Sequence, residues 1–321
     1  MLKARLFRFG LMTAFQFGMM IEGPASREQW TTLARKAEDL GYATLLLSDH
    51  LAASFPPISP LMAAADATRT LRIGSFVFDN DFRHPALLAR EAATLDLLSG
   101  GRFELGIGAG WFQPEYEQIG LPFDRAGVRI NRLGEAIDII KQFFTEETVT
   151  FAGSHYSVTG LKAFPKPLQR PHPPLLMGGG GKKLLTLAGR EADIIGLQIK
   201  LDDSGAFDTS EYTEAALAQK IGWIRQTAGE RFANVELNLV VGSVSITQNP
   251  QLVAEQYIRE TGLSAMTAEE LVASPYMFAG SVEQLVEKVQ RLREAFGISY
   301  FVVRTEYLEA FAPVLARLVG K

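Results

Sequence analysis

Short apolar runs bounded by polar residues alternate along this chain with segments in which apolar residues recur three or four positions apart. The first pattern is typical of buried parallel strands and the second of helices that pack on a sheet. Strands are expected at residues 7–15, 43–51, 71–78, 102–108, 175–177, 192–198, 235–246 and 299–304. Helices are expected at residues 26–41, 58–68, 85–98, 129–144, 182–189, 208–224, 281–296 and 307–319. Eight strand–helix units in one domain over residues 1–321 predict an α/β fold, a (β/α)₈ TIM barrel.

Four helix starts carry a polar residue followed three positions later by Glu or Gln, the spacing of a capping box. The pairs are Ser26 with Gln29, Asp208 with Glu211, Thr267 with Glu270, and Ser281 with Gln284. In such a box each side chain accepts a hydrogen bond from a backbone N–H of the first helical turn. We therefore expect helices to begin at these points.

The regular alternation is interrupted twice, which predicts two insertions on the barrel. After the fourth helix, Glu146–Pro173 contains no helical pattern, and the segments at 148–151 and 155–158 flank a turn at Ala152–Ser154. After the seventh strand, Asn249-Pro250 begins a helix within a longer excursion that ends at Gly280. Long insertions of this kind often carry functional loops.

The second expected strand ends in Ser48-Asp49-His50, and this end is a candidate catalytic site. In a parallel barrel the active site lies at the carboxyl ends of the strands. Histidine transfers protons near neutral pH, and the carboxylate of Asp49 is expected to orient His50 or to stabilise its charged form. The alternative is that Asp49 caps a helix beside a histidine with a purely structural role.

The run Gly178-Gly179-Gly180-Gly181-Lys182-Lys183 joins the fifth strand to a helix. Glycine leaves backbone N–H groups open to an anion, and the helix N-terminus adds a favourable dipole, so a phosphate site is expected here. The alternative is a tight turn that requires glycine for its conformation. A Walker loop is excluded, because Leu176 stands where its first glycine is required.

Two further strand ends could border a flat ring. Gly106–Trp111, with the sequence GIGAGW, lacks the third glycine of a dinucleotide fingerprint, so it predicts either a lip for a ring or close packing between strands. Phe76-Val77-Phe78-Asp79-Asn80 places polar residues after an apolar strand end, which suits an aromatic ligand or an ordinary strand end.

Composition narrows the class of protein further. The chain has no cysteine and a net charge of −4, so disulfides and thiolate chemistry are excluded and a nucleic-acid or anionic-membrane partner is not indicated. The four histidines are far apart, and we expect no metal site. No GxSxG motif supports a hydrolase, and no signal peptide or membrane span is evident, so a cytoplasmic location is expected.

Together these motifs resemble the luciferase-like flavin monooxygenase superfamily, and most of all its coenzyme F420-dependent oxidoreductases. The similarity runs from about Phe9 to Arg304, and the order and spacing of the motifs carry it. The matching pieces are Glu38–Tyr42, Ser48–His50, Arg83–Pro85, Leu97–Arg102, Gly106–Trp111, Phe151–Tyr156 and the proline-rich approach to Gly178–Gly181.

The resemblance implies a cofactor at the carboxyl end of the barrel, with coenzyme F420 expected and FMN as the alternative. His50 would handle a proton during hydride transfer, and the Phe76–Val77 peptide would be cis. Cofactor contacts are expected from Phe76, Val77, Asp79, Ala109, Gly110, Gly178, Gly179, Gly180, Gly181, Lys182 and Gln198. Analogy also predicts a homodimer that acts on a small molecule.

The chain departs from the sugar-phosphate dehydrogenases of this group at one position. Those enzymes place an acidic residue just after the strand-four glycines, where this chain has Trp111. Trp111 and Phe112 would line a more apolar substrate pocket, which argues against a sugar phosphate. Three hypotheses stay open: an F420-dependent oxidoreductase, an FMN-dependent monooxygenase that uses oxygen, and a barrel that binds flavin without turnover.

Overall fold

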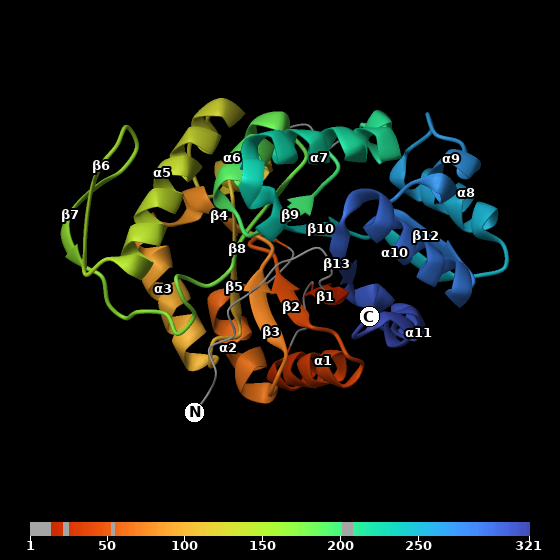
Figure 1. The fold of residues 1–321 in the computed structure, drawn as a ribbon, viewed down its shortest axis with the longest axis horizontal. Coiled ribbons are helices and arrows are strands. Elements are labelled where there is room, and N and C mark those ends of the chain that lie inside the picture. Colours follow the sequence, from red (N-terminus) through yellow and green to blue (C-terminus); the bar gives the residue numbers. More distant parts are fainter. Residues whose placement is uncertain (1–13, 22–25, 53–54, 201–207) are drawn as a thin grey trace.

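The computed structural model describes residues 14–21, 26–52, 55–200 and 208–321. Eight parallel strands close a barrel at the centre of the molecule, with β3 hydrogen-bonded to β5 and β1 to β13 (Figure 1). These strands are β1 (Gln16–Ile21), β2 (Thr44–Leu47), β3 (Arg72–Ser75), β5 (Phe103–Gly108), β8 (Leu175–Gly179), β9 (Ile194–Leu197), β10 (Glu236–Val240) and β13 (Ile298–Arg304). The (β/α)₈ barrel expected from the sequence is confirmed.

A helix follows each barrel strand and packs its apolar side on the outside of the sheet. These helices are α1 (Arg27–Asp39), α2 (Ile58–Ala67), α3 (Pro85–Leu98), α5 (Ala126–Thr145), α6 (Lys182–Glu191), α7 (Glu214–Ala228), α10 (Val282–Phe296) and α11 (Leu308–Leu318). The short strand β4 (Phe78–Asp79) continues the line of β3 and pairs with β5. The short helix α4 (Gln113–Gln118) stands between β5 and α5.

Both expected insertions are present, and they lie on opposite sides of the barrel (Figure 1). The antiparallel hairpin of β6 (Thr148–Ala152) and β7 (Ser157–Lys162) follows α5. The second insertion comprises β11 (Ser243–Ile246), α8 (Pro250–Thr261), α9 (Ala268–Ala273) and β12 (Met277–Gly280). In it β11 pairs in parallel with β12, outside the barrel sheet.

The strand expected at 71–78 divides into β3 and β4 around Phe76-Val77, and three other expected elements also differ from the structure. The first barrel strand is Gln16–Ile21 rather than 7–15; residues 7–13 of that prediction lie outside the described residues. Two neighbouring apolar runs compete there, and parallel pairing with β2 and β13 selects the second. The predicted strand at 235–246 divides into β10 and β11 around Gly242.

The third correction concerns the start of α7. Asp208 caps a 3₁₀ turn (Thr209–Tyr212) instead of the helix, and the side chain of Thr213 accepts the hydrogen bond that caps α7. The other three starts are confirmed, and Thr267 and Ser281 form complete capping boxes. Local spacing identifies a helix start here but does not resolve two candidate caps five positions apart.

The interior of the barrel has a polar floor and an apolar upper layer. Near the amino ends of the strands, Arg72 Nε lies 2.7 Å from Glu104 Oε1, and Gln16 Nε2 donates to Glu236 Oε1 over 3.0 Å. Above them an apolar cluster fills the barrel: Leu46, Phe76, Leu176, Ile194, Tyr300 and Val302. The closed, packed lower part directs any ligand toward the carboxyl ends of the strands.

Candidate active site

His50 lies just beyond the carboxyl end of β2 and is fixed by a buried carboxylate. Its Nδ1 is 2.9 Å from Oε2 of Glu115, a residue of α4 that is 5% exposed. The other oxygen of Glu115 accepts the backbone N–H of Leu51 over 2.8 Å. A carboxylate only accepts hydrogen bonds, so Nδ1 carries the proton in this pair. Nε2 has no hydrogen-bond partner among the described residues, and the His50 side chain is 33% exposed.

Two aromatic residues of the β5–α4 loop stand beside this histidine. The rings of His50 and Trp111 meet edge to face with their centroids 5.6 Å apart. The ring centroid of Phe112 lies 5.1 Å from that of Trp111. Trp111 is 40% exposed, although large apolar side chains are usually buried. Trp111 therefore adjoins His50, Phe112 packs behind Trp111, and the exposed Trp111 ring leaves an apolar surface next to the histidine.

In the described structure the Asp49 carboxylate forms no hydrogen bond with the His50 ring and instead joins the ends of β2 and β4. Both carboxylate oxygens of Asp49 pair with the guanidinium of Arg83, and Oδ2 accepts the backbone N–H of Asp79 over 3.0 Å. The expectation that Asp49 orients His50 is wrong, because Glu115 occupies that role in the structure. Asp49 instead holds the strand ends on which the site is built.

Asp79 lies beneath the loop that follows β5. Its two carboxylate oxygens accept the Tyr116 hydroxyl, each over 2.8 Å, and Oδ1 also accepts the N–H of Asp81 over 2.9 Å. Burial above all raises the pKa of Asp79 to about 6, while these two hydrogen bonds lower it. Gly110, at φ +71°, closes over this pair: a Cβ there would lie 1.8 Å from the Tyr116 oxygen.

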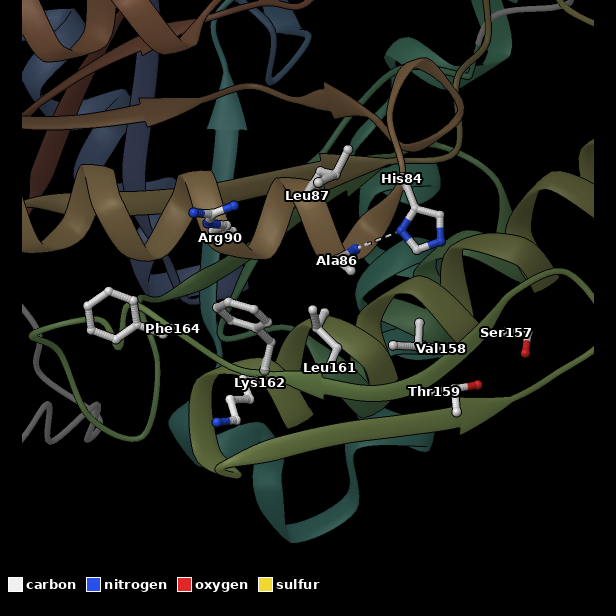
Figure 2. A pocket seen from close by; sticks show the side chains of 11 residues that line it. His84, Ala86, Leu87, Arg90, Ser157, Val158, Thr159, Leu161, Lys162 and Phe164 are labelled. Atoms are coloured by element: carbon white, nitrogen blue, oxygen red, sulfur yellow. Dashed lines mark hydrogen bonds between the residues drawn. The ribbon is translucent and has the colours of Figure 1, made fainter.

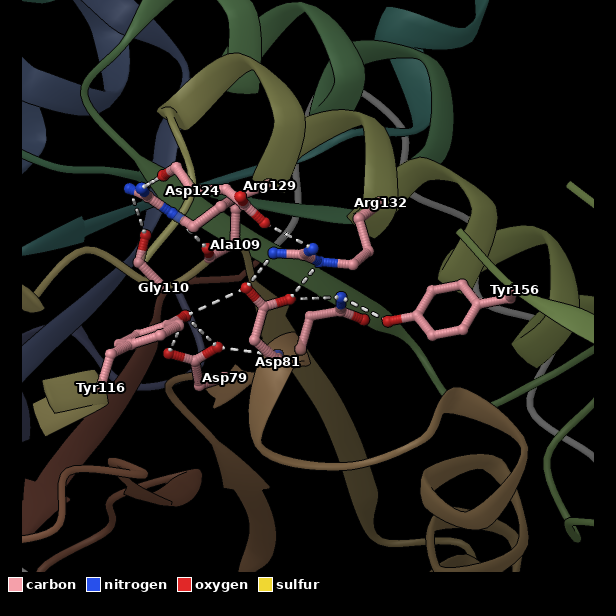
Figure 3. A network of polar contacts seen from close by, with 10 residues as sticks. Asp79, Asp81, Ala109, Gly110, Tyr116, Asp124, Arg129, Arg132 and Tyr156 are labelled. Carbon is pink, nitrogen blue, oxygen red and sulfur yellow. Dashed lines mark hydrogen bonds and ion pairs between the residues drawn. The ribbon is translucent and has the colours of Figure 1, made fainter. Parts of the chain in front are cut away.

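Two arginines of α5 tie together the backbone and carboxylates around Asp79 and Gly110 (Figure 3). The buried Arg129 donates to the carbonyl of Ala109 over 3.2 Å and to that of Gly110 over 3.3 Å. Arg132 forms ion pairs with Asp81 and Asp124, at 2.7 and 2.9 Å. The backbone of Ala109 and Gly110 is thus fixed by Arg129, and its expected role as a lip beside a ligand stays a prediction.

Phe76 and Val77 form an apolar wall on the inner side of the site. The Phe76 ring lies across two glycines, so that a Cβ on Gly178 or Gly196 would approach it to 3.7 or 3.1 Å. Val77 lies over Gly108, where a Cβ would be 2.7 Å from its Cγ2. The peptide between Phe76 and Val77 is cis, as expected from the resemblance.

Packing explains only part of the glycine run between β8 and α6. A Cβ on Gly179 would lie 2.4 Å from the Leu184 side chain, and one on Gly180 would lie 2.6 Å from the backbone nitrogen of Lys200. Gly178 has room for a Cβ, and no atom of the described residues lies within 4 Å of one on Gly181. Gly181 precedes α6 without a side-chain cap, so the first turn of this helix has N–H groups available to an anion.

The remaining expected cofactor residues lie around this run. Gln198 donates its backbone N–H to the carbonyl of Gly179 over 3.2 Å. The ammonium of Lys182 lies 5.9 Å from the centroid of the Trp223 ring, and that of Lys183 donates to the carbonyl of Gly127 over 2.8 Å. Gln198 therefore borders the glycine run directly, whereas both lysines have other contacts.

Sequence comparison identifies the family to which this chain belongs. The profile of the luciferase-like monooxygenase family matches residues 7–269. The chain belongs to this family. It is 28% identical over 205 residues to the FMNH₂-dependent dimethylsulfone monooxygenase of Pseudomonas putida, and 36% identical over 165 residues to the F420-dependent glucose-6-phosphate dehydrogenase of Microbacterium testaceum. These matches cover 58% and 49% of the chain and 56% and 48% of the relatives, so the chain spans about half the length of each.

Another member of the luciferase-like family matches at greater length. The F420-dependent glucose-6-phosphate dehydrogenase of Kribbella flavida is 30% identical over 330 aligned residues, which cover 89% of this chain and 93% of the relative. Among solved structures, the coenzyme F420-dependent tetrahydromethanopterin reductase of Methanopyrus kandleri superposes with a TM-score of 0.75 at 18% identity, covering 96% of this chain and 99% of the other. At this low identity, the superposition on the reductase shows only that the two proteins share a fold.

Sequence reasoning missed three residues of this luciferase-like site: Glu115, Arg83 and Tyr116. Arg83 belongs to one of the motifs that carry the resemblance, but its partner Asp49 is 34 positions away. Glu115 is 65 positions from His50, and its helix has only six residues. The single available signal was an acidic residue shortly after the glycines of β5.

Two surface grooves in the described part of the chain lie away from His50. One, of about 560 Å³, runs between α3 and β7 and is bordered by Leu87, Arg90, Leu161 and Phe164 (Figure 2). The other, of about 450 Å³, lies between α5 and α6. Within the described ranges no cluster of three or more His, Asp or Glu side chains could hold a metal ion, and no helix is long and apolar enough to cross a membrane.

Proposed function

We propose that this protein is an oxidoreductase that binds coenzyme F420 at the barrel mouth and transfers hydride between it and a small organic substrate. The observation that carries the proposal is His50, whose Nδ1 is fixed by Glu115 while Nε2 is available at the mouth. The F420-dependent relatives, one of which aligns over 89% of this chain, support the choice of cofactor. A homodimer stays an expectation from analogy.

The bound cofactor supplies the hydride chemistry, and the protein supplies position and proton transfer. His50 Nε2 would accept a proton from a substrate hydroxyl during oxidation, or return it to a carbonyl oxygen during reduction. The Glu115 carboxylate then stabilises the charged imidazolium through Nδ1. Trp111 and Phe112 exclude water from the substrate side and favour an apolar substrate over a sugar phosphate.

The residues at the mouth fit a ring with a phosphate arm. Phe76 and Val77 offer an apolar wall. At Gly178 and Gly181 a larger side chain would fit, so packing does not explain why these two positions are glycine, and their backbone is open to a phosphate. The Ser48 hydroxyl is buried at the end of β2 with no hydrogen-bond partner among the described residues. Along β2, Leu46 faces the barrel interior, so Ser48 points the same way and could bond to a polar ring edge.

The second candidate is an FMN-dependent monooxygenase, favoured by the dimethylsulfone monooxygenase of Pseudomonas putida among the relatives. A third possibility, a barrel that binds flavin without turnover, leaves the His50–Glu115 pair without a use. The substrate is proposed only as a small molecule whose reacting group is an alcohol, a carbonyl or an activated double bond.

Parallel fluorescence titrations of the purified protein with coenzyme F420 and FMN test the choice of cofactor. Tighter binding of F420 supports hydride transfer, and tighter binding of FMN moves the assignment to oxygen chemistry. If neither binds more tightly than roughly 1 mM, or about −4 kcal/mol, the proposed site is wrong.

His50→Gln tests the proton-transfer role separately. We expect kcat to fall by about 10²–10⁴-fold, the usual contribution of a general acid or base, while the cofactor Kd changes little. His172→Gln serves as the matched control, because His172 lies in the proline-rich segment, where its Nδ1 donates to the carbonyl of Pro173 over 2.9 Å. A His50→Gln variant with full activity would exclude His50 as the catalytic residue.

A further inference from the structure

Lys220 of α7 has an almost completely buried ammonium group. The side chain is 1% exposed, whereas lysines are among the residues most rarely buried. Its Nζ donates to the backbone carbonyl of Gln198 over 2.8 Å and forms an ion pair with Glu211 in the 3₁₀ turn before α7. A buried charge is tolerated only when such partners replace water.

The carbonyl that Lys220 holds is also the surface against which the glycine run packs. Gln198 donates its N–H to the carbonyl of Gly179, so its peptide groups are fixed on both sides. Gly180 approaches so closely that a Cβ there would lie 2.9 Å from the Gln198 oxygen and 2.6 Å from the nitrogen of Lys200. Any shift of Gln198 therefore displaces the glycine run.

We propose that Lys220 is a positioning residue for the phosphate-binding backbone of Gly178–Gly181, an inference that rests on the proposed function. Glycines have no side chains to fix their conformation, so their N–H groups stay aligned on an anion only if neighbouring backbone holds them. Lys220 fixes this neighbour from outside the barrel and does not itself reach the ligand. Preorganised donors bind more tightly than donors that must first be ordered.

This role predicts an effect on one part of the cofactor only. Substitution of Lys220 weakens contacts to the phosphate arm, while the ring still packs on Phe76 and Val77. The readout is the ratio of dissociation constants for a ligand without and with its phosphate: riboflavin against FMN, and the dephosphorylated deazaflavin core against coenzyme F420. A merely structural role would change both members of each pair equally and leave the ratio constant.

Lys220→Met is the principal variant, and Lys288→Met is its matched control. Lys288 of α10 is also buried and donates to three carbonyls, those of Val272, Ser274 and Met277, but these belong to the second insertion rather than to the glycine run. We expect Lys220→Met to lower the phosphate preference about tenfold, an effect typical of residues that orient binding groups. Lys288→Met should lower the melting temperature without changing the preference.

Glu211→Gln provides a second measurement in case Lys220→Met does not fold. It keeps the ammonium on the Gln198 carbonyl but removes its charged partner, so the phosphate preference should fall by a smaller factor. An unchanged preference in both variants, or an equal loss in Lys288→Met, would overturn the positioning role alone. A wild-type protein that binds FMN no better than riboflavin, and F420 no better than its core, would overturn the phosphate site itself.

Discussion

Glu236 on the polar floor of the barrel makes the stability of this protein depend on pH. The residue is 3% exposed and accepts hydrogen bonds from Gln16 and Ser299. Burial above all, with the nearby charge of Glu104, raises the pKa of Glu236 from 4.5 to about 8, against smaller opposing effects of Ser299 and Arg72. At neutral pH the folded protein therefore retains a proton that the unfolded chain releases.

The sign and size of the effect follow from this difference. A raised carboxyl pKa contributes stability that is complete below pH 4.5 and is lost as the pH rises through about 8. Between pH 6 and pH 8 the loss amounts to about 2 kcal/mol. Two other shifted groups act in this interval: Asp79, raised to about 6, and Lys288, lowered to about 8. They change stability in opposite directions by less than about 1 kcal/mol each, so Glu236 dominates.

Glu236→Gln removes the titration while keeping the shape of the side chain. Urea unfolding at pH 6, 7 and 8 measures the free energy of unfolding. We expect the wild-type value to fall by about 2 kcal/mol from pH 6 to pH 8 and the variant value to stay nearly constant. Glu255→Gln, the same change on the exposed side of α8, should follow the wild type. Parallel pH dependences of the wild type and Glu236→Gln would refute the assignment of the buried proton.

Two further substitutions test the site and its supporting packing. Glu115→Gln removes the charge beside His50, and we expect a fall in kcat of about 10–100-fold with little change in KM or melting temperature; steady-state kinetics that match the wild type would contradict the pairing. Gly106→Ala would place a Cβ 1.9 Å from the carbonyl oxygen of Ser75, so we expect the free energy of unfolding to fall by at least about 3 kcal/mol. Gly222→Ala in α7 meets nothing within 4 Å and should instead stabilise by up to about 1 kcal/mol, and comparable stabilities of the two variants would be inconsistent with this packing.

The sequence determined the architecture because its information is local. Apolar spacing within each segment fixed the order of strands and helices, and with it the barrel and both insertions. The position of His50 also followed, since a residue after a parallel strand lies at the mouth of the barrel. The roles of the glycine run and of the apolar wall toward a cofactor stay predictions.

The tertiary structure alone decided which distant residues meet. Local pattern could not choose between two apolar runs for β1, because only pairing with β2 and β13 distinguishes them. Nor could it pair His50 with Glu115 rather than with the adjacent Asp49, since neighbouring residues after a strand point in different directions. The contact of Lys220 with Gln198 arises in the same way. Closing the barrel brings α7 onto the end of β9, and no feature of either segment by itself specifies that contact.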